Sequence, residues 1–512
     1  MKKSKISIFI VLFLIFTIAY PIFIMLMNSD LSSFKELVQT NSFKIAIKNS
    51  LFVTTISTVI SVIIGFLLAY AINRTKIKQK KLLILLLTIP MLIPSISHGV
   101  GIINLFGTNG IISSLFNFNV IGKVGIILGS VMYSFPIAFL MINDGFNYIN
   151  ISLYDLSKVI GLNKWQTFKK ITLVYLKKPL LSAIFAVFTM IFTDYGVALS
   201  VGGKYLVLPV YLYKEVIGLL DFQKGILISL FLLIPAIISF IIDILLKDYN
   251  SNLYNKGYEI KDNKRRDILF GIFTYTVIIF IFIVIGSFIY YAFIDNPHLN
   301  KTISLIHFKY VLDDGIIKYI FNSLLIAISV SIIGTIISYI IAYYTSRIRG
   351  KLTKIVHILT IASLSIPGIV LGISYVVCFK DSLIYNTFII LIIVNIVHFI
   401  ATPYLLAYNA LNKLNDNYEV IAKTCNISLF RLLKDIIVPN TKNTITEMFS
   451  YFFVNSMITI SAVAFLFSVD TMPVSLMINK YEGNLMLGEA AIVSLVILVI
   501  NLSLKIATTK NN

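Results

Sequence analysis

Two short clusters of polar side chains interrupt long apolar stretches of this sequence. A charge at the centre of a bilayer costs about 2.5 to 3.5 kcal/mol, so polar groups in apolar segments call for a functional explanation. We predict that they line a passage for a polar solute. Two alternatives stay open: Ser and Thr can bond the carbonyls of their own helix, and the acidic residue can lie at a solvated helix end. The residues concerned are Asp194, Tyr195, Asn455, Ser456, Thr459 and Ser461.

The sequence offers no motif for catalysis or metal binding. It contains no G-x-x-x-x-G-K-[ST] phosphate loop, no H-E-x-x-H zinc motif and no convincing nucleophile elbow. Cys378 and Cys425 are its only cysteines, one in an apolar stretch and one in a polar loop, so no disulfide or cysteine metal site is predicted. We therefore predict no catalytic residue, no metal and no cofactor in this chain.

The composition is that of an integral membrane protein. Hydrophobic residues make up 58% of the chain, charged residues only 13%, and the mean hydropathy is +0.91. A spanning helix needs roughly 20 apolar residues. We predict an all-α membrane protein with about twelve transmembrane helices, near 6–27, 45–72, 83–105, 124–146, 180–201, 225–246, 268–294, 319–344, 355–378, 386–408, 444–468 and 486–504.

The basic residues fall mainly on one side of these predicted spans. Most of the 43 Lys and Arg lie at the two ends of the chain and in alternate loops, which by the positive-inside rule places both termini in the cytoplasm. The net charge of +20 does not indicate nucleic-acid binding, because the basic residues are spread over short loops that flank helices. The bilayer is the expected environment.

The two halves of the chain repeat one another. Asn49-Ser50-Leu51 recurs as Asn322-Ser323-Leu324, and Arg74 recurs as Arg347 at the same offset. Apolar low-complexity sequence can mimic a repeat, but matches at Asn and Arg in the same order are harder to obtain by chance. Each copy has an even number of spans, so the copies are expected to be related by an axis along the membrane normal, with a pathway between them. We predict two six-helix halves, 1–247 and 268–512, joined by a cytoplasmic linker, 248–267.

A long amphipathic segment follows the fourth span of each half, at about 150–178 and 413–442. In the first copy Gly161 permits a sharp turn between two short helices, and in the second Asn426 takes its place, Asn being the next residue best able to enter the left-handed region. The same helix-turn-helix element is therefore predicted twice. An amphipathic helix lying on the lipid surface is the alternative.

These segments resemble the signature of the integral permeases of bacterial ABC importers, Glu-Ala-Ala, three residues, Gly, nine residues, Ile, any residue, Leu-Pro. In the first copy Gly161 and Ile171 match; in the second Ile436 and Pro439 match, but the acid is displaced by one and Gly becomes Asn. The resemblance implies a type I importer permease whose loops are coupling helices docking on an ATPase. The candidate docking residues are Asp155, Lys158, Gly161, Trp165, Glu419, Ala422, Lys423 and Asn426.

The same resemblance implies the partners. They would be two copies of a separate ATPase subunit, which uses ATP and Mg, and an extracytoplasmic substrate-binding protein, in a bacterial plasma membrane. Segments from Thr193 to Gly203 and from Val454 to Val463 are similar to fused permeases for 2-aminoethylphosphonate, and also to ferric-iron permeases. The phosphonate is our expected solute and ferric iron the runner-up. A major-facilitator secondary transporter and a polytopic membrane enzyme remain as alternatives.

Overall fold

The computed structural model describes the chain except residues 1, 109, 117–118, 148, 150–151, 246–259, 261, 297–299, 349, 416 and 511–512. Most of the predicted 248–267 linker lies outside the described residues. The described part is almost entirely helical, with one two-stranded antiparallel hairpin, β1 (Ile294–Asn296) and β2 (Asn300–Ile303). The predicted all-α fold is confirmed.

The helices of the first half follow the predicted order of spans. Several are joined end to end by short π or 3-10 turns, so that one span can contain two labelled helices. They are α1 (Lys2–Leu14), α2 (Tyr20–Met27), α3 (Leu31–Gln39), α4 (Asn41–Arg74), α5 (Lys80–Leu87), α6 (Ser95–Phe106), α7 (Ser113–Phe116), α8 (Lys123–Asn147), α9 (Ser152–Val159), α10 (Lys164–Thr167), α11 (Leu173–Thr193), α12 (Gly196–Val201), α13 (Leu208–Tyr213) and α14 (Phe222–Leu245).

The second half repeats this order, with the hairpin inserted between its first two helices, α15 and α16. Its helices are α15 (Lys264–Phe293), α16 (Ile306–Asp313), α17 (Ile316–Arg347), α18 (Lys351–Ala362), α19 (Gly368–Phe379), α20 (Phe388–Phe399), α21 (Ala401–Asn412), α22 (Asn417–Thr424), α23 (Leu429–Leu432), α24 (Val438–Asn440), α25 (Lys442–Ile458), α26 (Val474–Gly483) and α27 (Leu487–Lys510).

Among the described residues, eight helices or helix runs are long and apolar enough to cross a bilayer. The pair α18 and α19 is bent by 108°, and the pair α20 and α21 by 53°. If each bent pair is one span, the number of spans rises to ten. The other two predicted spans are shorter. The span at 83–105 is broken between α5 and α6, where Pro90 and Pro94 interrupt the helix. The span at 444–468 corresponds to α25, which ends at Ile458.

The predicted bounds of the fifth span, 180–201, need correction. The helix run begins at Lys164, continues through a π turn and ends at Thr193. It ends there because Asp194 has extended backbone, with φ −78° and ψ 126°. Thr459 ends α25 in the same way, with φ −66° and ψ 135°. Both breaks fall inside stretches that hydropathy alone reads as continuous helix.

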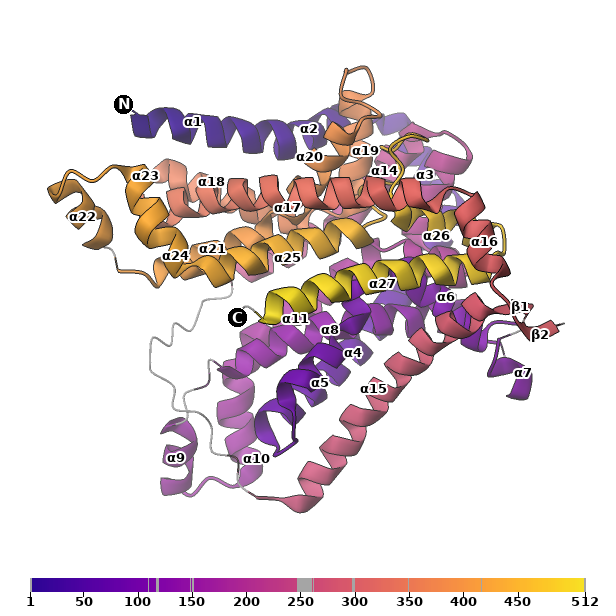
Figure 1. The fold of residues 1–512 in the computed structure, drawn as a ribbon, viewed down its shortest axis with the longest axis horizontal. Coiled ribbons are helices and arrows are strands. Elements are labelled where there is room, and N and C mark those ends of the chain that lie inside the picture. The colour runs from indigo at the N-terminus through magenta and orange to yellow at the C-terminus, as the bar shows by residue number, and fades with distance from the viewer. Residues whose placement is uncertain are drawn as a thin grey trace.

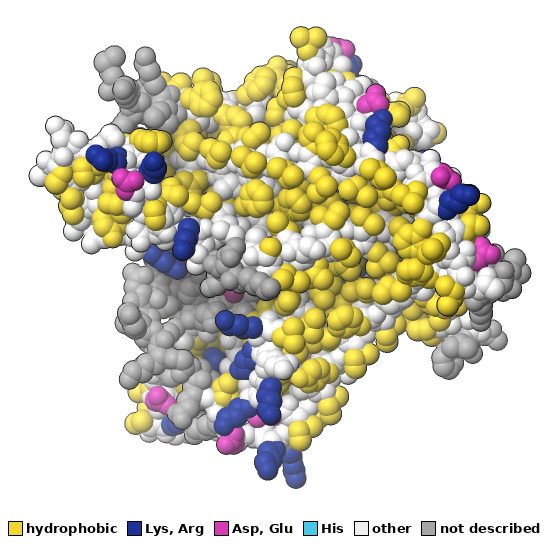
Figure 2. All heavy atoms as spheres, viewed as in Figure 1, with side chains coloured by type: hydrophobic (Ala, Val, Ile, Leu, Met, Phe, Trp, Pro, Cys, Tyr) yellow, Lys and Arg dark blue, Asp and Glu magenta, His cyan; other side chains and the backbone are white. Residues whose placement is uncertain are grey.

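The surface carries a broad hydrophobic band between two charged ends. In the view of Figure 2, hydrophobic side chains cover the long helices, and Lys, Arg, Asp and Glu gather near the two ends of the molecule. The N-terminal end of α1, the C-terminal end of α27 and the helices α9, α10, α22 and α23 all lie toward the same end (Figure 1). This arrangement is that of a bundle whose band faces lipid.

Each half lends its first helix to the other. The segment α1–α2 packs against α18 and α19 of the second half, and the Tyr375 hydroxyl of α19 donates to the Thr17 carbonyl over 2.7 Å. In return α15 packs against α4 and α6 of the first half. Gly101 of α6 permits this approach, because a Cβ there would meet the side chains of Val284 and Phe288. The two halves therefore share one core.

The repeated Asn-Ser pair makes the same contacts in both halves. The Asn49 amide donates to the Leu206 carbonyl over 2.9 Å, and the Ser50 hydroxyl accepts from the Leu208 amide over 2.7 Å. In the second half the Asn322 amide donates to the Asp470 and Met472 carbonyls, over 2.8 and 3.2 Å, and the Ser323 hydroxyl accepts from an amide over 2.7 Å. We call each set an Asn-Ser clamp. It holds the first turn of α13 or α26.

Candidate functional site: coupling elements and central crossing

The first predicted coupling element is two short helices at a sharp turn. Gly161 has φ +73° and separates α9 from α10, and Asn163 forms a capping box with Gln166 that starts α10. Asp155 and Lys158 form an exposed ion pair over 2.5 Å. Trp165 is 68% exposed and stacks on Phe168. The predicted left-handed glycine turn is confirmed.

The second element copies the first with other side chains. Asn426 has φ +57°, as predicted, and Ser428 caps α23 by accepting from the Arg431 amide. Ala422 is buried, while Lys423 is exposed. Phe430 is 76% exposed at the position that corresponds to Trp165. Both elements therefore show an aromatic side chain to their surroundings at the same place in the fold.

Glu419 lies against its own half rather than pointing outward. Its side chain is 21% exposed, and its Oε1 lies 3.6 Å from Nε of Arg347, which is itself buried. The Tyr343 hydroxyl also donates to Glu419, over 3.3 Å, and Arg347 donates to the carbonyls of Leu411 and Leu414. The arginine thus ties the start of α22 to the end of α17.

Arg74 makes the corresponding contact in the first half. It is 6% exposed at the end of α4 and donates to the Tyr154 hydroxyl over 3.2 Å. Its guanidinium also lies over the rings of Phe146 and Tyr154, at 5.0 and 5.2 Å from their centroids. The Tyr154 hydroxyl shares a second hydrogen bond with Thr172 over 2.8 Å. Tyr154 occupies the repeat position of Glu419.

The two polar clusters end at what we call the central crossing, formed by Ser95, Tyr195, Gly196, Ile460, Ser461, Gly368 and Asn479. A Cβ on Gly196 would meet Ser95 and Ile460, and a Cβ on Gly368 would meet Ser461. Ser faces Gly at both approaches, with the two residue types exchanged between the halves. Only such small residues permit this close packing.

Tyr195 joins the halves by a direct hydrogen bond. Its ring is fully buried and stacks on Tyr213 with centroids 4.9 Å apart. Its hydroxyl accepts from the Asn479 amide of α26 over 3.2 Å. Composition gave no sign of Asn479 or Tyr213, because neither belongs to a polar cluster. Asn479 lies next to Lys480 and near Glu482 in the short helix α26, so no isolated polar residue in an apolar stretch marked it.

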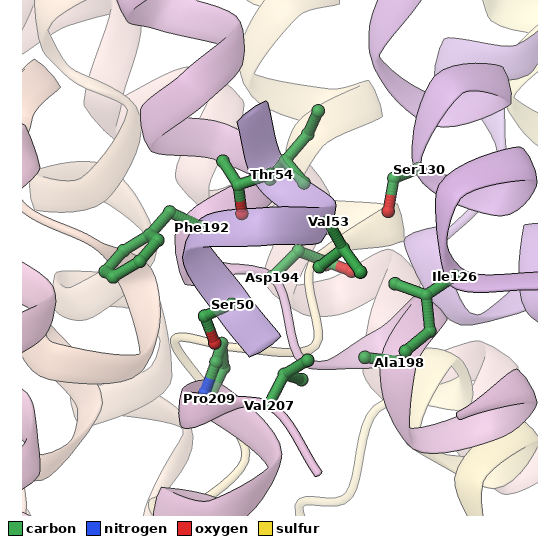
Figure 3. Close-up of a pocket in the computed structure, with 11 residues that line it drawn as sticks. Ser50, Val53, Thr54, Ile126, Ser130, Phe192, Asp194, Ala198, Val207 and Pro209 are labelled. Carbon is green, nitrogen blue, oxygen red and sulfur yellow. The ribbon is translucent and has the colours of Figure 1, made fainter. Parts of the chain in front are cut away.

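Asp194 lies where α11 ends and α12 begins, and it is partly buried. One of its carboxylate oxygens accepts a hydrogen bond from the Val197 amide over 3.0 Å, so Asp194 caps α12. The Ser95 side chain is a second hydrogen-bond partner of the carboxylate. Figure 3 shows Asp194 among side chains of α4 and α8, including Thr54 and Ser130. The cavity beside it has a volume of about 10 Å³, the size that holds one water molecule. This space is too small for a solute larger than water.

The second cluster is less uniform than the sequence suggested. The Asn455 amide donates to the Tyr451 carbonyl of its own helix over 2.8 Å, in agreement with the self-bonding alternative. Ser456 is buried, and the Thr459 carbonyl accepts from Ser475 over 2.8 Å. Of this cluster, the structure brings Ser461 to the central crossing. Among the described residues, no group of three or more His, Cys, Asp or Glu could hold a metal ion.

A family of known proteins matches both halves of the chain. The model described as "Binding-protein-dependent transport system inner membrane component" matches residues 61–248 and again 334–510, together well over half of the sequence. The chain belongs to this family. The two matched segments confirm the predicted duplication, and the membership decides against the major-facilitator and membrane-enzyme alternatives.

The curated relatives are permeases. A putative ferric transport system permease protein of Haemophilus influenzae is 25% identical over 90% of this chain and 77% of its own length. The ferric transport system permease protein of Actinobacillus pleuropneumoniae is 25% identical over 85% of this chain and 66% of its own. A thiamine permease of H. influenzae matches 49% of this chain and 46% of its own, at 24% identity. A transport subunit rather than an enzyme is confirmed.

This chain is similar to one chain of the solved structure of a bacterial alginate ABC transporter, in complex with a periplasmic protein that holds an alginate pentasaccharide. The match is 18% identical, covers 47% of this chain and 91% of the matched chain, and has a TM-score of 0.36. The family match and the helices described above, rather than this similarity, establish the multi-pass membrane fold.

Proposed function

We propose that this fused permease works as the membrane subunit of an ATP-driven importer and docks one ATPase subunit at each coupling element. The observation that carries the proposal is the duplicated element with exposed apolar residues. Exposed apolar side chains gather in each element: Val159, Ile160 and Trp165 in the first, and Ile421, Leu429 and Phe430 in the second. Groups of exposed apolar residues, unlike single ones, are typical of protein interfaces. Because the elements are repeat copies at one end of the molecule, two copies of the same ATPase can bind.

The arrangement of charges supports a cytoplasmic position for that end. The basic N-terminus, the tail and both coupling elements share it, and short basic loops stay in the cytoplasm. The opposite end, with α16 and the hairpin, is then available to an extracytoplasmic binding protein, on which the family's description says transport depends. Residues 1–247 and 268–512 would act as the two pseudo-equivalent gates, joined through 248–267.

The solute best supported is ferric iron. Two relatives that cover most of this chain are named as ferric transport permeases. In the short segments that suggested 2-aminoethylphosphonate, the residues have structural roles: Asp194 caps α12, and Gly196 and Ser461 allow helices to pack closely. Such positions fit any fused permease of this architecture, so they favour neither solute. Ferric iron therefore replaces the phosphonate as first candidate.

Uptake measurements separate the two solutes. A strain that lacks this gene should lose uptake of radiolabelled ferric iron and regain it with the gene on a plasmid. Uptake of radiolabelled 2-aminoethylphosphonate should stay unchanged in the same strain. Loss of phosphonate uptake with normal iron uptake would reverse the order of the candidates. If the purified chain retained no ATPase subunit, the proposed function itself would be wrong.

A further inference from the structure

We infer that helices α4 and α17 each transmit movement from a coupling element to the central crossing, and we call these two helices the rods. Each rod is held at both ends, and Arg74 and Arg347 are the positioning residues that attach the rods to the coupling elements. The inference rests on the proposed function, which supplies a motor at those elements. It assigns to both arginines and to the Asn-Ser clamps a role in coupling that no motif in the sequence indicates. Two independent copies of the same arrangement carry it.

The inner end of each rod is fixed by its arginine. Arg74 holds the coupling element through the hydroxyl and ring of Tyr154. Arg347 holds the other element through the carboxylate of Glu419 and the carbonyls at the end of α21. Both guanidinium groups are nearly buried, with 6% exposure for Arg74 and 3% for the Arg347 side chain. Buried hydrogen bonds to a charged group are stronger than exposed ones, so each joint resists displacement.

The outer end of each rod is fixed by the Asn-Ser clamp. Asn49 and Ser50 grip the chain at Leu206 and Leu208, where α13 begins, and Asn322 and Ser323 grip the matching place before α26. The joint and the clamp are 25 residues apart in both halves, so the rod between them is about 37 Å long at 1.5 Å per residue. Both helices are continuous over this length.

The clamped helices lead directly to the central crossing. Asn479, on α26, donates to Tyr195, and Ser50 and Thr54 of α4 line the cavity of Asp194. In the second half the ion pair of Arg347, helix α17, the clamp on α26 and the bond from Asn479 connect the coupling element with the central crossing. In the first half α4 connects Arg74 with the clamp on α13, and Tyr213 of α13 stacks on Tyr195. A displacement of the docked ATPase would move the segments that close the passage. Because the docked ATPase and the binding protein would both act on the same helix, contact of the binding protein at the far end should change ATP hydrolysis.

The repeat supplies its own matched variants. Glu419→Ala removes the ion pair, whereas Glu419→Tyr installs the side chain that performs this task in the first half. Glu419→Gln is a milder change that keeps the shape. Thr446→Ala, at an exposed hydroxyl that bonds its own helix, controls for mutation of this half. Each variant is reconstituted with its ATPase and binding protein, and ATP hydrolysis is measured with and without the binding protein.

We expect Glu419→Ala to lose the fold-stimulation by the binding protein, taken as the ratio of ATP hydrolysis with and without that protein, and Glu419→Gln to be intermediate. Glu419→Tyr should regain stimulation, and Asn322→Ala, at the far clamp, should reproduce the loss. Combining Asn322→Ala with Glu419→Ala should add little, because either change interrupts the same rod. Normal stimulation in Glu419→Ala would overturn the inference, as would release of the ATPase, which would make Glu419 a docking contact. A wild-type chain that binds no ATPase would instead refute the proposed function.

Discussion

A bulky residue at Gly161 should weaken ATPase docking through backbone strain alone. Gly161 has φ +73°, and a Cβ added there meets nothing within 4 Å, so space is not limiting. Holding a β-branched residue in the left-handed region costs about 1 to 2 kcal/mol. Because 1.4 kcal/mol is a factor of ten, Gly161→Val should weaken binding of the ATPase by about 5- to 30-fold. Gly161→Asn should change it little, since Asn426 adopts the same conformation in the repeat.

The assay is the equilibrium affinity of the purified ATPase for the permease in nanodiscs, by biolayer interferometry. Asn426→Gly serves as a second control, because it should preserve or slightly ease the other turn. If Gly161→Val and Gly161→Asn bound the ATPase equally well, the left-handed turn would not be needed for docking. If Gly161→Asn were as weak as Gly161→Val, the effect would come from loss of glycine rather than from strain.

Three further predictions concern stability and topology. Ser323→Ala leaves a buried amide without its acceptor and should lower the free energy of unfolding by about 1 to 3 kcal/mol, seen as a lower Tm in detergent. The hydrogen bond with Glu489 raises the pKa of His307 above 6.5, so the protonated His307 stabilises the folded chain. This contribution to stability is complete below pH 6.5 and is lost as the pH rises through the raised pKa. The Tm of the wild type should fall in that pH range, and the Tm of His307→Gln should not. In a Cys378→Ser variant, exposed Cys425 should react with an impermeant thiol reagent only after cells are opened. Labelling of Cys425 in intact cells would show that the chain has the opposite orientation in the membrane.

Much of the fold followed from local patterns. Apolar length alone located the long spans, because a lipid-facing helix must satisfy its own backbone bonds. The matched Asn, Ser and Arg residues identified the repeat, and the turns at Gly161 and Asn426 followed from the conformational freedom of those residue types. The spans and turns depend on neighbours in sequence, and the repeat depends only on residue identity, so the sequence was sufficient for all three.

What the sequence hid depends on contacts between distant segments. Hydropathy could not show that Asp194 ends a helix, since its acceptor role toward Val197 exists only in the folded break. The sequence could not show the ion pair of Glu419, because its partner, Arg347, lies 72 residues away along the chain. The clamps at Ser50 and Ser323 likewise reach over more than a hundred residues. Matched repeat positions were the available signal for them.

The exchange of first helices has a consequence for biosynthesis. Tyr375 and Thr17, which bond across the halves, are separated by 358 positions. At roughly 5 to 20 residues per second, the ribosome makes that distance in about 20 to 70 s. Throughout this time the first membrane segment must wait in lipid without its final neighbours. Its strongly apolar surface, with a mean hydropathy of 2.8 over Ile8–Met27, suits such a delay. The first helix can therefore reach its final place only after synthesis has passed Tyr375, well into the second half.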